Sequence, residues 1–270
     1  MIESYEQESW VEEVWRTYLT QGETEKERRQ RRLFRYLPGS PRCKGCYAPF
    51  SGAGNVIVRL FYDKRPSNLN PYLCNVCEKF AREHPGGAEV ELSLLFADVR
   101  GSTGLAEKLG TVEFSRLINR FYRIASQILV ESDALIDKII GDQAAGIYVP
   151  GFAGKQHARR AIDAGRKLLA ATGHESATTP WIPLGVGIHT GNAYVGSVGS
   201  KGGTMDITVL GDAANTAARL ASEAKAGEIL ISEAAYAAAD LELDSLEVRR
   251  LALKGKSQAV SVHVLSDYNQ

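Results

Sequence analysis

Residues 91–103 read ELSLLFADVRGST, and the rest of the chain is organised around them. Leu92 to Ala97 form an apolar run with the length and composition of a strand, and the run ends on a single carboxylate, Asp98. The Gly-Ser-Thr sequence at 101–103 then predicts a turn into a helix. Backbone N–H groups at such a helix start lie beside the charge of Asp98, so that phosphate and metal could share the spot. Alone, a strand-ending aspartate is more often a helix N-cap or turn residue than a metal ligand.

The composition indicates a globular protein without a dominant charge. The chain has 270 residues, of which 44% are hydrophobic and 24% charged, enough for one large core and a smaller appendage. Its 32 basic and 32 acidic residues cancel, so neither nucleic acid nor a membrane surface is expected as a partner. No apolar run has spanning length, and the N-terminal sequence MIESYEQESW lacks the basic and apolar regions of a signal peptide. We therefore expect a cytoplasmic location.

Four cysteines fall in two CxxC pairs, Cys43 with Cys46 and Cys74 with Cys77. In a reducing compartment this spacing predicts a metal site rather than disulfides. The first pair is expected to form a knuckle, residues 56–62 an apolar strand and the second pair a helix start, an order that resembles the treble-clef zinc finger. Four thiolates suit a structural Zn²⁺, which could fold a segment too small to hold itself together. Zinc is the favoured interpretation, and an iron–sulfur cluster is the alternative.

The cysteine pairs lie between two N-terminal helical segments and the main domain. Residues 5–20 repeat apolar side chains at helical spacing, and a second, arginine-rich helical segment extends to about Leu37. Residues 84–87, His-Pro-Gly-Gly, predict a linker. We expect N-terminal helices at 1–38, a four-cysteine metal-binding regulatory domain with its linker at 39–87, and the main domain at 88–270.

From residue 89 onward short strands alternate with helices, which predicts an α+β domain with helices over one mostly antiparallel sheet. The strands are expected at 92–97, 134–140, 144–149, 182–189, 193–197, 205–210, 228–232, 246–253 and 259–265. The helices are expected at 103–131, 157–171 and 212–224, with a short alanine-rich helix after residue 232. Turns are expected at 141–143 and at 190–192, where Thr-Gly-Asn separates two strands.

A second carboxylate stands at the tip of the hairpin, in Gly141-Asp142. If this hairpin lies beside the strand that ends on Asp98, both acids meet at one edge of the sheet. Hard oxygen ligands suit Mg²⁺ or Mn²⁺, and two such ions serve reactions at phosphorus. By itself, a Gly-Asp hairpin tip is usually only a turn.

At this point the chain resembles the class III adenylate and guanylate cyclases. The resemblance rests on four motifs, which are FADVRGST at 96–103, Lys138-Ile-Ile-Gly-Asp142, Gly211-Asp212-Ala-Ala-Asn215-Thr-Ala-Ala-Arg219 and Lys254-Gly255-Lys256. Their order and spacing agree with the family from about residue 89 to 265. The resemblance implies a ferredoxin-like βαββαβ cyclase palm domain with extra C-terminal strands and helices.

The resemblance also implies the roles of individual residues. Asp98 and Asp142 would ligate two Mg²⁺ or Mn²⁺ ions, with the Val99 carbonyl assisting. The phosphates would lie on the turn formed by Arg100, Gly101, Ser102 and Thr103, and Lys254 would hold the terminal phosphates, with Lys256 a weaker candidate. Asn215 would orient the ribose and Arg219 would stabilise charge on the reacting phosphate. Independently of the family, residues four apart share a helix face and can reach one ligand together, and a guanidinium grips phosphate bidentately.

Base selection resembles the adenylate-specific members of the family. Lys138 stands where a lysine accompanies adenine recognition, and Thr208 stands where one large subclass has threonine and many others aspartate. A lysine can donate to a ring nitrogen and a threonine hydroxyl can accept from the exocyclic amine. Asp206 lies two residues away, so a shifted register is the alternative. Two departures from the family pattern are the sequences at 100–102 and at 143–146, and neither removes a catalytic group.

The leading hypothesis is a homodimeric enzyme that cyclises ATP to 3′,5′-cyclic AMP and pyrophosphate. In the family, the aspartates come from one subunit and the base-reading, ribose and phosphate residues from the other, which gives two sites per dimer. The alternative hypothesis is a nucleotide-binding regulatory module without turnover, whose four-cysteine domain senses redox state or reads a partner.

Overall fold

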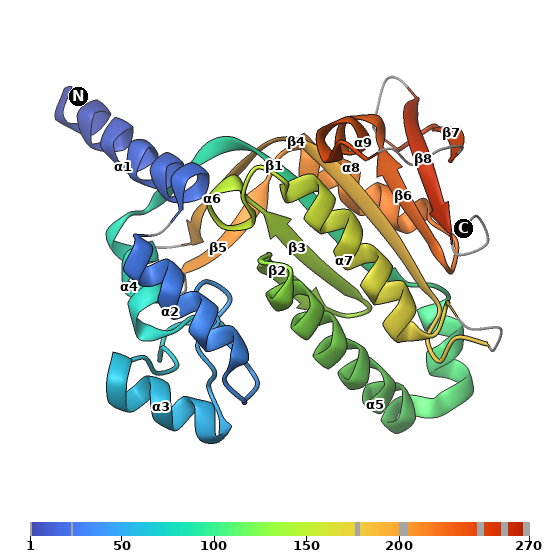
Figure 1. Ribbon diagram of the computed structural model, residues 1–270, viewed down its shortest axis with the longest axis horizontal. Coiled ribbons are helices and arrows are strands. Elements are labelled where there is room, and N and C mark those ends of the chain that lie inside the picture. The colour runs from blue at the N-terminus through green and yellow to red at the C-terminus, as the bar shows by residue number, and fades with distance from the viewer. Residues whose placement is uncertain are drawn as a thin grey trace. The chain divides into compact units, whose positions relative to one another are not determined.

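The computed structural model describes residues 2–22, 24–175, 179–199, 205–241, 246–254 and 259–266 (Figure 1). For residues 2–7, Lys138 and Ile140 it describes the backbone alone. The chain divides into two compact units. The first unit comprises Met1–Val90, Pro150–Phe152 and Tyr194–Leu210, and the second comprises Glu91–Val149, Ala153–Ala193 and Gly211–Gln270.

One sheet runs in the order β2-β3-β1-β4-β6-β8-β7, and β5 pairs with β4. The strands are β1 (Gly86–Val99), β2 (Leu135–Ile140), β3 (Gln143–Tyr148), β4 (Leu184–Gly199), β5 (Met205–Leu210), β6 (Glu228–Ser232), β7 (Glu247–Leu251) and β8 (Val260–Ser266). The pairs of β1 with β3, β2 with β3 and β4 with β5 are antiparallel, whereas β4 and β6 are parallel. The order β2-β3-β1-β4, with a helix after β1 and another after β3, confirms the expected ferredoxin-like core.

Helices cover both faces of the sheet in the second unit. They are α5 (Ser102–Glu131), α7 (His157–Thr172), α8 (Asp212–Glu223) and α9 (Glu233–Ala239). The short α6 (Pro150–Ala153), most of which belongs to the first unit, precedes α7. Figure 1 shows α5 and α7 side by side on one face, where Phe121 and Leu168 join Ile229 of β6 in the main core. The next residue of β6, Leu230, packs instead with Leu220 of α8. Because side chains alternate along a strand, α8 lies on the opposite face.

The first unit contains α1 (Ile2–Gln21), α2 (Glu25–Tyr36), α3 (Gly52–Tyr62) and α4 (Asn75–Glu83). α2 begins with a capping box, in which Thr24 and Glu27 each accept a backbone N–H. Trp15 of α1 is fully buried, and its Nε1 donates to the carbonyl of His84 at 3.0 Å. These contacts fasten α1 to the end of α4. Among the described residues no helix is both long and apolar enough to cross a membrane.

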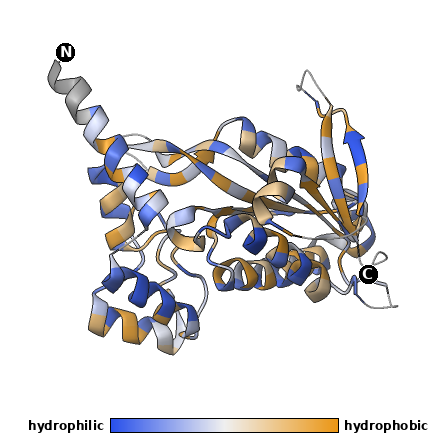
Figure 2. Cartoon of the chain, turned by 45° about the horizontal axis from the view of Figure 1, so that its top comes forward, coloured by the Kyte–Doolittle hydropathy of each residue, from blue (hydrophilic) through white to orange (hydrophobic). Residues whose placement is uncertain are grey.

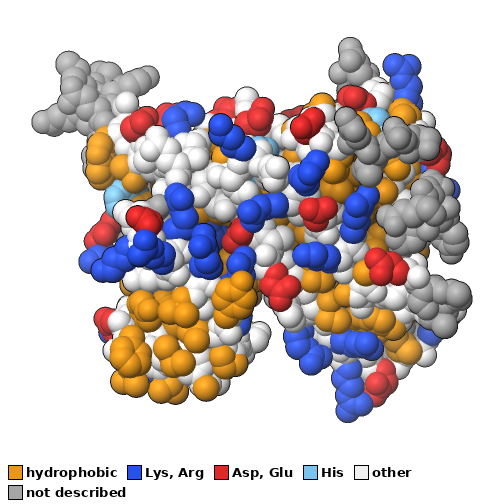
Figure 3. Space-filling model, in the orientation of Figure 1, with side chains coloured by type: hydrophobic (Ala, Val, Ile, Leu, Met, Phe, Trp, Pro, Cys, Tyr) orange, Lys and Arg blue, Asp and Glu red, His pale blue; other side chains and the backbone are white. Residues whose placement is uncertain are grey.

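The strand expected at 56–62 is wrong, because these residues form α3. Val58 is buried, but Leu60 and Phe61 are 75% and 76% exposed. In Figure 2 the residues of α3 are mostly orange while those of α2 are mostly blue, and Figure 3 shows apolar side chains gathered over α3. The apolar run therefore marks an exposed helix surface, and a short apolar run does not by itself distinguish a strand from a helix.

Two further expectations about β1 and β4 are corrected. Thr190-Gly191-Asn192 does not form a turn, since β4 continues through it as one strand. Residues 86 and 87 belong to β1 rather than to a linker. A Cβ on Gly87 would lie 2.6 Å from the Cα of Gly196, so glycine is needed where the two backbones approach each other. The glycine pair that suggested a linker thus serves strand packing.

Candidate active site and cysteine centre

The structure brings the two predicted carboxylates together in the second unit. Asp98 at the end of β1 lies opposite Gln143, the first residue of β3. The N–H of Val99 donates to the carbonyl of Asp142 at 3.0 Å. The pairing of β1 with β3 therefore places Asp98 beside the Gly141-Asp142 turn, and two carboxylates at one sheet edge are a donor set that suits Mg²⁺ or Mn²⁺.

The turn after β1 has the backbone geometry expected for a phosphate loop. Gly101 has a φ of 63°, which is left-handed, and nothing lies within 4 Å of the position of a Cβ there. The N–H of Leu105 donates to the Gly101 carbonyl and begins α5, so the N–H groups of Ser102 and Thr103 belong to an open helix end. The Ser102 hydroxyl donates to Asp142 Oδ2 at 2.6 Å, which joins the turn to the second carboxylate.

Arg100 is oriented toward Asp98. Its guanidinium forms an ion pair with the Asp98 carboxylate and donates to the carbonyl of Ser222 at 2.6 Å. Burial lowers the pKa of Arg100, while the charges of Asp142 and Glu223 act in the opposite direction. The second oxygen of Asp98 accepts from the Gln143 amide. The sequence identified Arg100 only as part of the phosphate turn and gave no sign that Gln143 would contact Asp98.

Helix α8 carries Asn215 and Arg219 outside its buried face. Asn215 is exposed and Arg219 is half-buried, while Ala217 and Ala221 are buried against β4. A Cβ on Gly187 of β4 would lie 2.2 Å from the N of Ala221 and 2.5 Å from the Ala217 carbonyl oxygen. Glycine is therefore required for α8 to lie as close to the strand as it does.

The remaining predicted residues are distributed over three elements. Lys138 lies on β2 opposite Ala145, next to a register shift, and its side chain lies outside the described residues. Lys254 is exposed in a turn after β7, and Lys256 lies outside the described residues. Thr208 lies on β5 opposite Gly196 and is 9% exposed. In the described part of the chain, no hydrogen bond or ion pair joins Asn215, Arg219 or Lys254 to the two aspartates.

The family of adenylate and guanylate cyclase catalytic domains matches residues 88–267. The chain belongs to this family. The chain is 29% identical over 184 residues to the terminal-differentiation specific adenylate cyclase of Dictyostelium discoideum, which covers 65% of this chain and 9% of that protein. It is 30% identical over 184 residues to the adenylate cyclase of Anabaena cylindrica, which covers 64% of this chain and 36% of that protein. This chain thus spans well under half the length of these two relatives.

Solved cyclase structures resemble the same part of the chain. The adenylyl cyclase CyaB from P. aeruginosa covers 67% of this chain and 96% of its own, with a TM-score of 0.58 and 29% identity. The guanylyl cyclase Cya2 covers 66% of this chain and 93% of its own, with a TM-score of 0.60 and 24% identity, and this likeness concerns the fold alone.

The chain also contains a cysteine cluster in its first unit. The Sγ atoms of Cys43, Cys46, Cys74 and Cys77 all lie within 4.8 Å of one another, and three of the four residues are buried. Cys46 and Cys74 Sγ are 3.6 Å apart. Four thiolates held about 2.3 Å from one tetrahedral ion lie roughly 3.8 Å apart, so the cluster fits a single ion.

The surroundings shift the pKa values of the four thiols in different directions. Burial raises the pKa of Cys43, and hydrogen bonds from the other thiols raise the pKa of Cys77. Hydrogen bonds from the thiols of Cys43 and Cys46 lower the pKa of Cys74. The ammonium of Lys64 lies 3.6 Å from Cys46 Sγ. Burial alone would lower the pKa of Lys64, but the thiolate charges raise it. Lys64 therefore stays protonated and offsets part of the negative charge of the cluster, a role that its sequence position did not indicate.

Proposed function

We propose that the chain is an adenylate cyclase that converts ATP to 3′,5′-cyclic AMP and pyrophosphate. The observation that supports this most is the meeting of Asp98 and Asp142 at the end of β1, with Ser102 bonded to Asp142 at the start of α5. In the reaction, the 3′ oxygen forms a bond to the α-phosphorus, the bond from this phosphorus to the bridging oxygen breaks, and the hydroxyl loses its proton. Pyrophosphate leaves with that bridging oxygen.

The two carboxylates and the Val99 carbonyl would hold two divalent cations. When bound, the cations supply charge neutralisation of the triphosphate and acidify the attacking hydroxyl. Backbone and side-chain groups of the protein would bind and orient the substrate. The open N–H groups at the start of α5 bind phosphate oxygens, Asn215 orients the ribose, and Arg219 and Lys254 stabilise the phosphate charge.

Lys138 and Thr208 are our candidates for adenine recognition. Thr208 is nearly buried, so a hydroxyl there that accepts from the exocyclic amine would discriminate against a base that lacks the donor. Two relatives at 29% and 30% identity are named adenylate cyclases, which favours ATP over GTP.

We propose that the active sites are shared between two copies of the chain. Asp98 and Asp142 would come from one copy, and Lys138, Thr208, Asn215, Arg219 and Lys254 from the other. The resemblance of the four motifs to the family supports this division, and Asn215 is exposed on α8, where a second copy could reach it. The helices at 1–38 and the four-cysteine segment at 39–87 would then form a regulatory part that precedes the catalytic part at 88–270.

At the four cysteines we propose one Zn²⁺. The four cysteines of an iron–sulfur cluster are divided among two or four iron atoms that are separated by inorganic sulfide, so the four sulfur atoms as a set lie farther apart than four thiolates on one ion. A colourless protein with about one zinc per chain is expected by elemental analysis. A brown protein that absorbs near 400 nm would contradict zinc.

The test of the enzymatic proposal is turnover by the purified full chain with Mn²⁺ and either ATP or GTP. We expect pyrophosphate and cyclic AMP in equal amounts from ATP, and a much lower rate from GTP. Asp142→Asn should abolish both products, whereas Asp163→Asn, a matched change on the exposed face of α7, should not. Binding of ATP without product would favour the regulatory module, and faster turnover of GTP would reverse the substrate assignment.

A further inference from the structure

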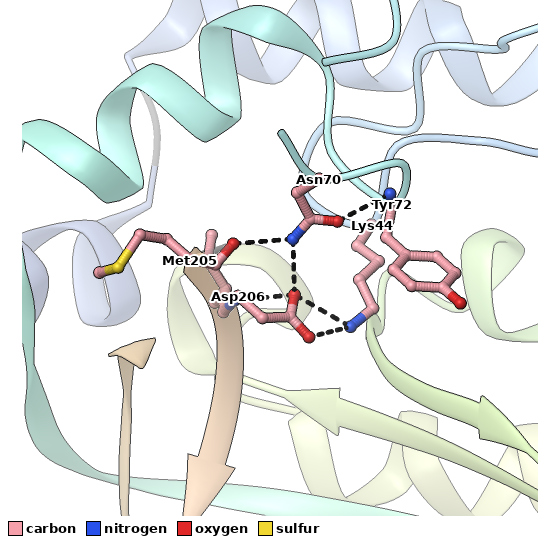
Figure 4. A network of polar contacts seen from close by, with 6 residues as sticks. Lys44, Asn70, Tyr72, Met205 and Asp206 are labelled. Carbon is pink, nitrogen blue, oxygen red and sulfur yellow. Dashed lines mark hydrogen bonds and ion pairs between the residues drawn. The ribbon is translucent and has the colours of Figure 1, made fainter. Parts of the chain in front are cut away.

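The two loops that carry the cysteines both contact β5, the strand that bears Thr208 (Figure 4). Lys44 lies between Cys43 and Cys46, and its ammonium is 3.0 Å from Asp206 Oδ2 and 3.3 Å from Oδ1. The Lys44 side chain is 12% exposed and the Asp206 side chain is 36% exposed, so this ion pair is partly shielded from solvent.

Asn70 makes the second contact from the loop that precedes Cys74. It is 1% exposed, and its amide nitrogen donates to the Met205 carbonyl at 2.7 Å and to Asp206 Oδ1 at 3.3 Å. Its amide oxygen accepts from the Tyr72 N–H at 2.8 Å, and the Tyr72 carbonyl in turn accepts from the Lys44 N–H at 2.9 Å. Lys44 and Asn70 are thus linked to each other as well as to β5.

A third contact holds the partner strand of β5. The Ser197 hydroxyl on β4 donates to the carbonyl of Ala81 at 2.8 Å, and Ala81 belongs to α4, the helix that contains Cys77. Among the described residues β5 pairs with β4 alone. A strand with one pairing partner is held by a single row of backbone bonds, so side-chain contacts at its start carry a larger share of its stability.

The position of these contacts along β5 connects them to base selection. Asp206 and Thr208 are two residues apart on one strand, so they point to the same side and are separated by roughly 7 Å. Thr208 is followed two residues later by the end of β5, from which Gly211 leads into α8 with Asn215 and Arg219. A displacement at Asp206 would therefore be transmitted first to Thr208.

We propose that Lys44 and Asn70 are positioning residues through which the metal-bound cysteine loops set the place of Thr208, and with it the preference for ATP. This proposal rests on the proposed function, because it takes Thr208 as the residue that reads the base. It predicts that the metal centre controls substrate selection and is more than a local support. Both residues would act through their contacts with β5 rather than by contact with the nucleotide.

The test compares Lys44→Met, Asn70→Ala and Lys44→Arg with wild type, all checked for one bound metal per chain. Lys79→Met is the matched control, since this lysine of α4 is 64% exposed and lies 3.7 Å from Glu83. Hydrogen–deuterium exchange of a peptide that covers residues 205–210 should be faster in Lys44→Met and Asn70→Ala by about tenfold, the effect of losing one shielded polar contact. Lys44→Arg keeps the positive charge, so the exchange rate of this peptide should lie close to that of wild type. The exchange rate in the control variant should equal that of wild type.

The kinetic arm measures kcat/KM for ATP and for GTP. Lys44→Met and Asn70→Ala should lower the value for ATP by about tenfold and change that for GTP little, so that the ATP/GTP ratio falls. A merely structural role would lower both values equally. Should Lys44→Met lose its metal, Asn70→Ala, which lies outside the CxxC knuckle, decides the question.

The proposal would be overturned if the metal-loaded variants exchanged at the wild-type rate and also kept the wild-type ratio of kcat/KM for ATP to kcat/KM for GTP. Faster exchange with an unchanged ratio would overturn the role in base selection. If wild type turned over neither nucleotide, the proposed function would fail, and the proposal about base selection would fall with it, while the exchange data would still report whether Lys44 and Asn70 hold β5.

Discussion

At the scale of single residues, Asp98 is the most constrained group of the candidate active site. Its carboxylate pairs with Arg100 and accepts from Gln143, so cations must compete with a guanidinium for the same oxygens. We expect Arg100→Met to lower the half-saturating Mn²⁺ concentration about threefold to tenfold, because it removes an ion pair worth roughly 1 kcal/mol. The measurement is a Mn²⁺ titration of the rate at saturating ATP, with the exposed Arg116→Met as control. A higher Mn²⁺ requirement would instead mean that Arg100 helps to hold the metal-bound triphosphate.

A second residue-scale prediction concerns His157 at the start of α7. Its Nδ1 lies 2.8 Å from the buried Ser93 hydroxyl, which lies 2.6 Å from the Thr190 hydroxyl. Burial lowers the pKa of His157, with the Glu91 charge opposing it. Below the ordinary histidine pKa of about 6.5 the unfolded chain takes up a proton that the folded state resists. The contribution of neutral His157 to the free energy of unfolding should therefore be fully present above that pH. It should be lost as the pH falls from there toward the lower pKa of the folded state. We expect the free energy of unfolding, measured in urea, to fall less between pH 7.5 and pH 5.5 for His157→Gln than for wild type. An equal fall in both proteins would refute the assignment.

At the scale of elements, the approach of α8 to β4 decides where Asn215 and Arg219 lie. A Cβ at Gly187 would collide with the backbone of α8 at Ala221 and Ala217, and the backbone cannot rotate away as a side chain can. Gly187→Ala should therefore lower the free energy of unfolding by about 1–3 kcal/mol and reduce kcat at least tenfold. Gly104→Ala is the stability control, since nothing lies within 4 Å of its Cβ position and helical alanine is favoured over glycine. Normal activity in Gly187→Ala would show that the position of α8 is not critical.

At the scale of the whole molecule, shared active sites predict complementation. Asp98→Ala and Arg219→Ala should each be nearly inactive, but an equal mixture with subunit exchange should recover about one quarter of the wild-type rate. Half of the dimers would then be mixed, and each mixed dimer would hold one intact site of two. The pair Asp98→Ala and Asp142→Ala is the control, because both changes fall in the same half-site and no mixed dimer holds an intact site. Failure of the first pair to recover, with exchange demonstrated, would contradict the shared site.

Local patterns in the sequence determined most of the secondary structure and the candidate chemistry. The helix at 157–172, the hairpin of β2 and β3 and the strand at 228–232 follow from side-chain periodicity and turn residues, which act over a few positions. The four cyclase motifs and the two CxxC pairs are likewise local, so the carboxylates and the cysteines could be singled out before the fold was known. The meeting of Asp98 with Asp142 followed once the hairpin was assigned beside β1.

Only the tertiary structure decided what these residues touch. Lys44 and Asp206 are 162 positions apart, and Arg249 of β7 pairs with Glu228 of β6 through charges that no local pattern connects. The apolar run of α3 and the continuous course of β4 through Gly191 depend on what packs against them, since the same letters suit a strand or a helix, a turn or an extended chain. Short-range preference is weak and is overridden wherever packing of distant segments buries more surface or satisfies more polar groups. For that reason the sequence alone determined most of the elements and the reactive groups of this chain, and the fold decided their partners and the course of α3 and β4.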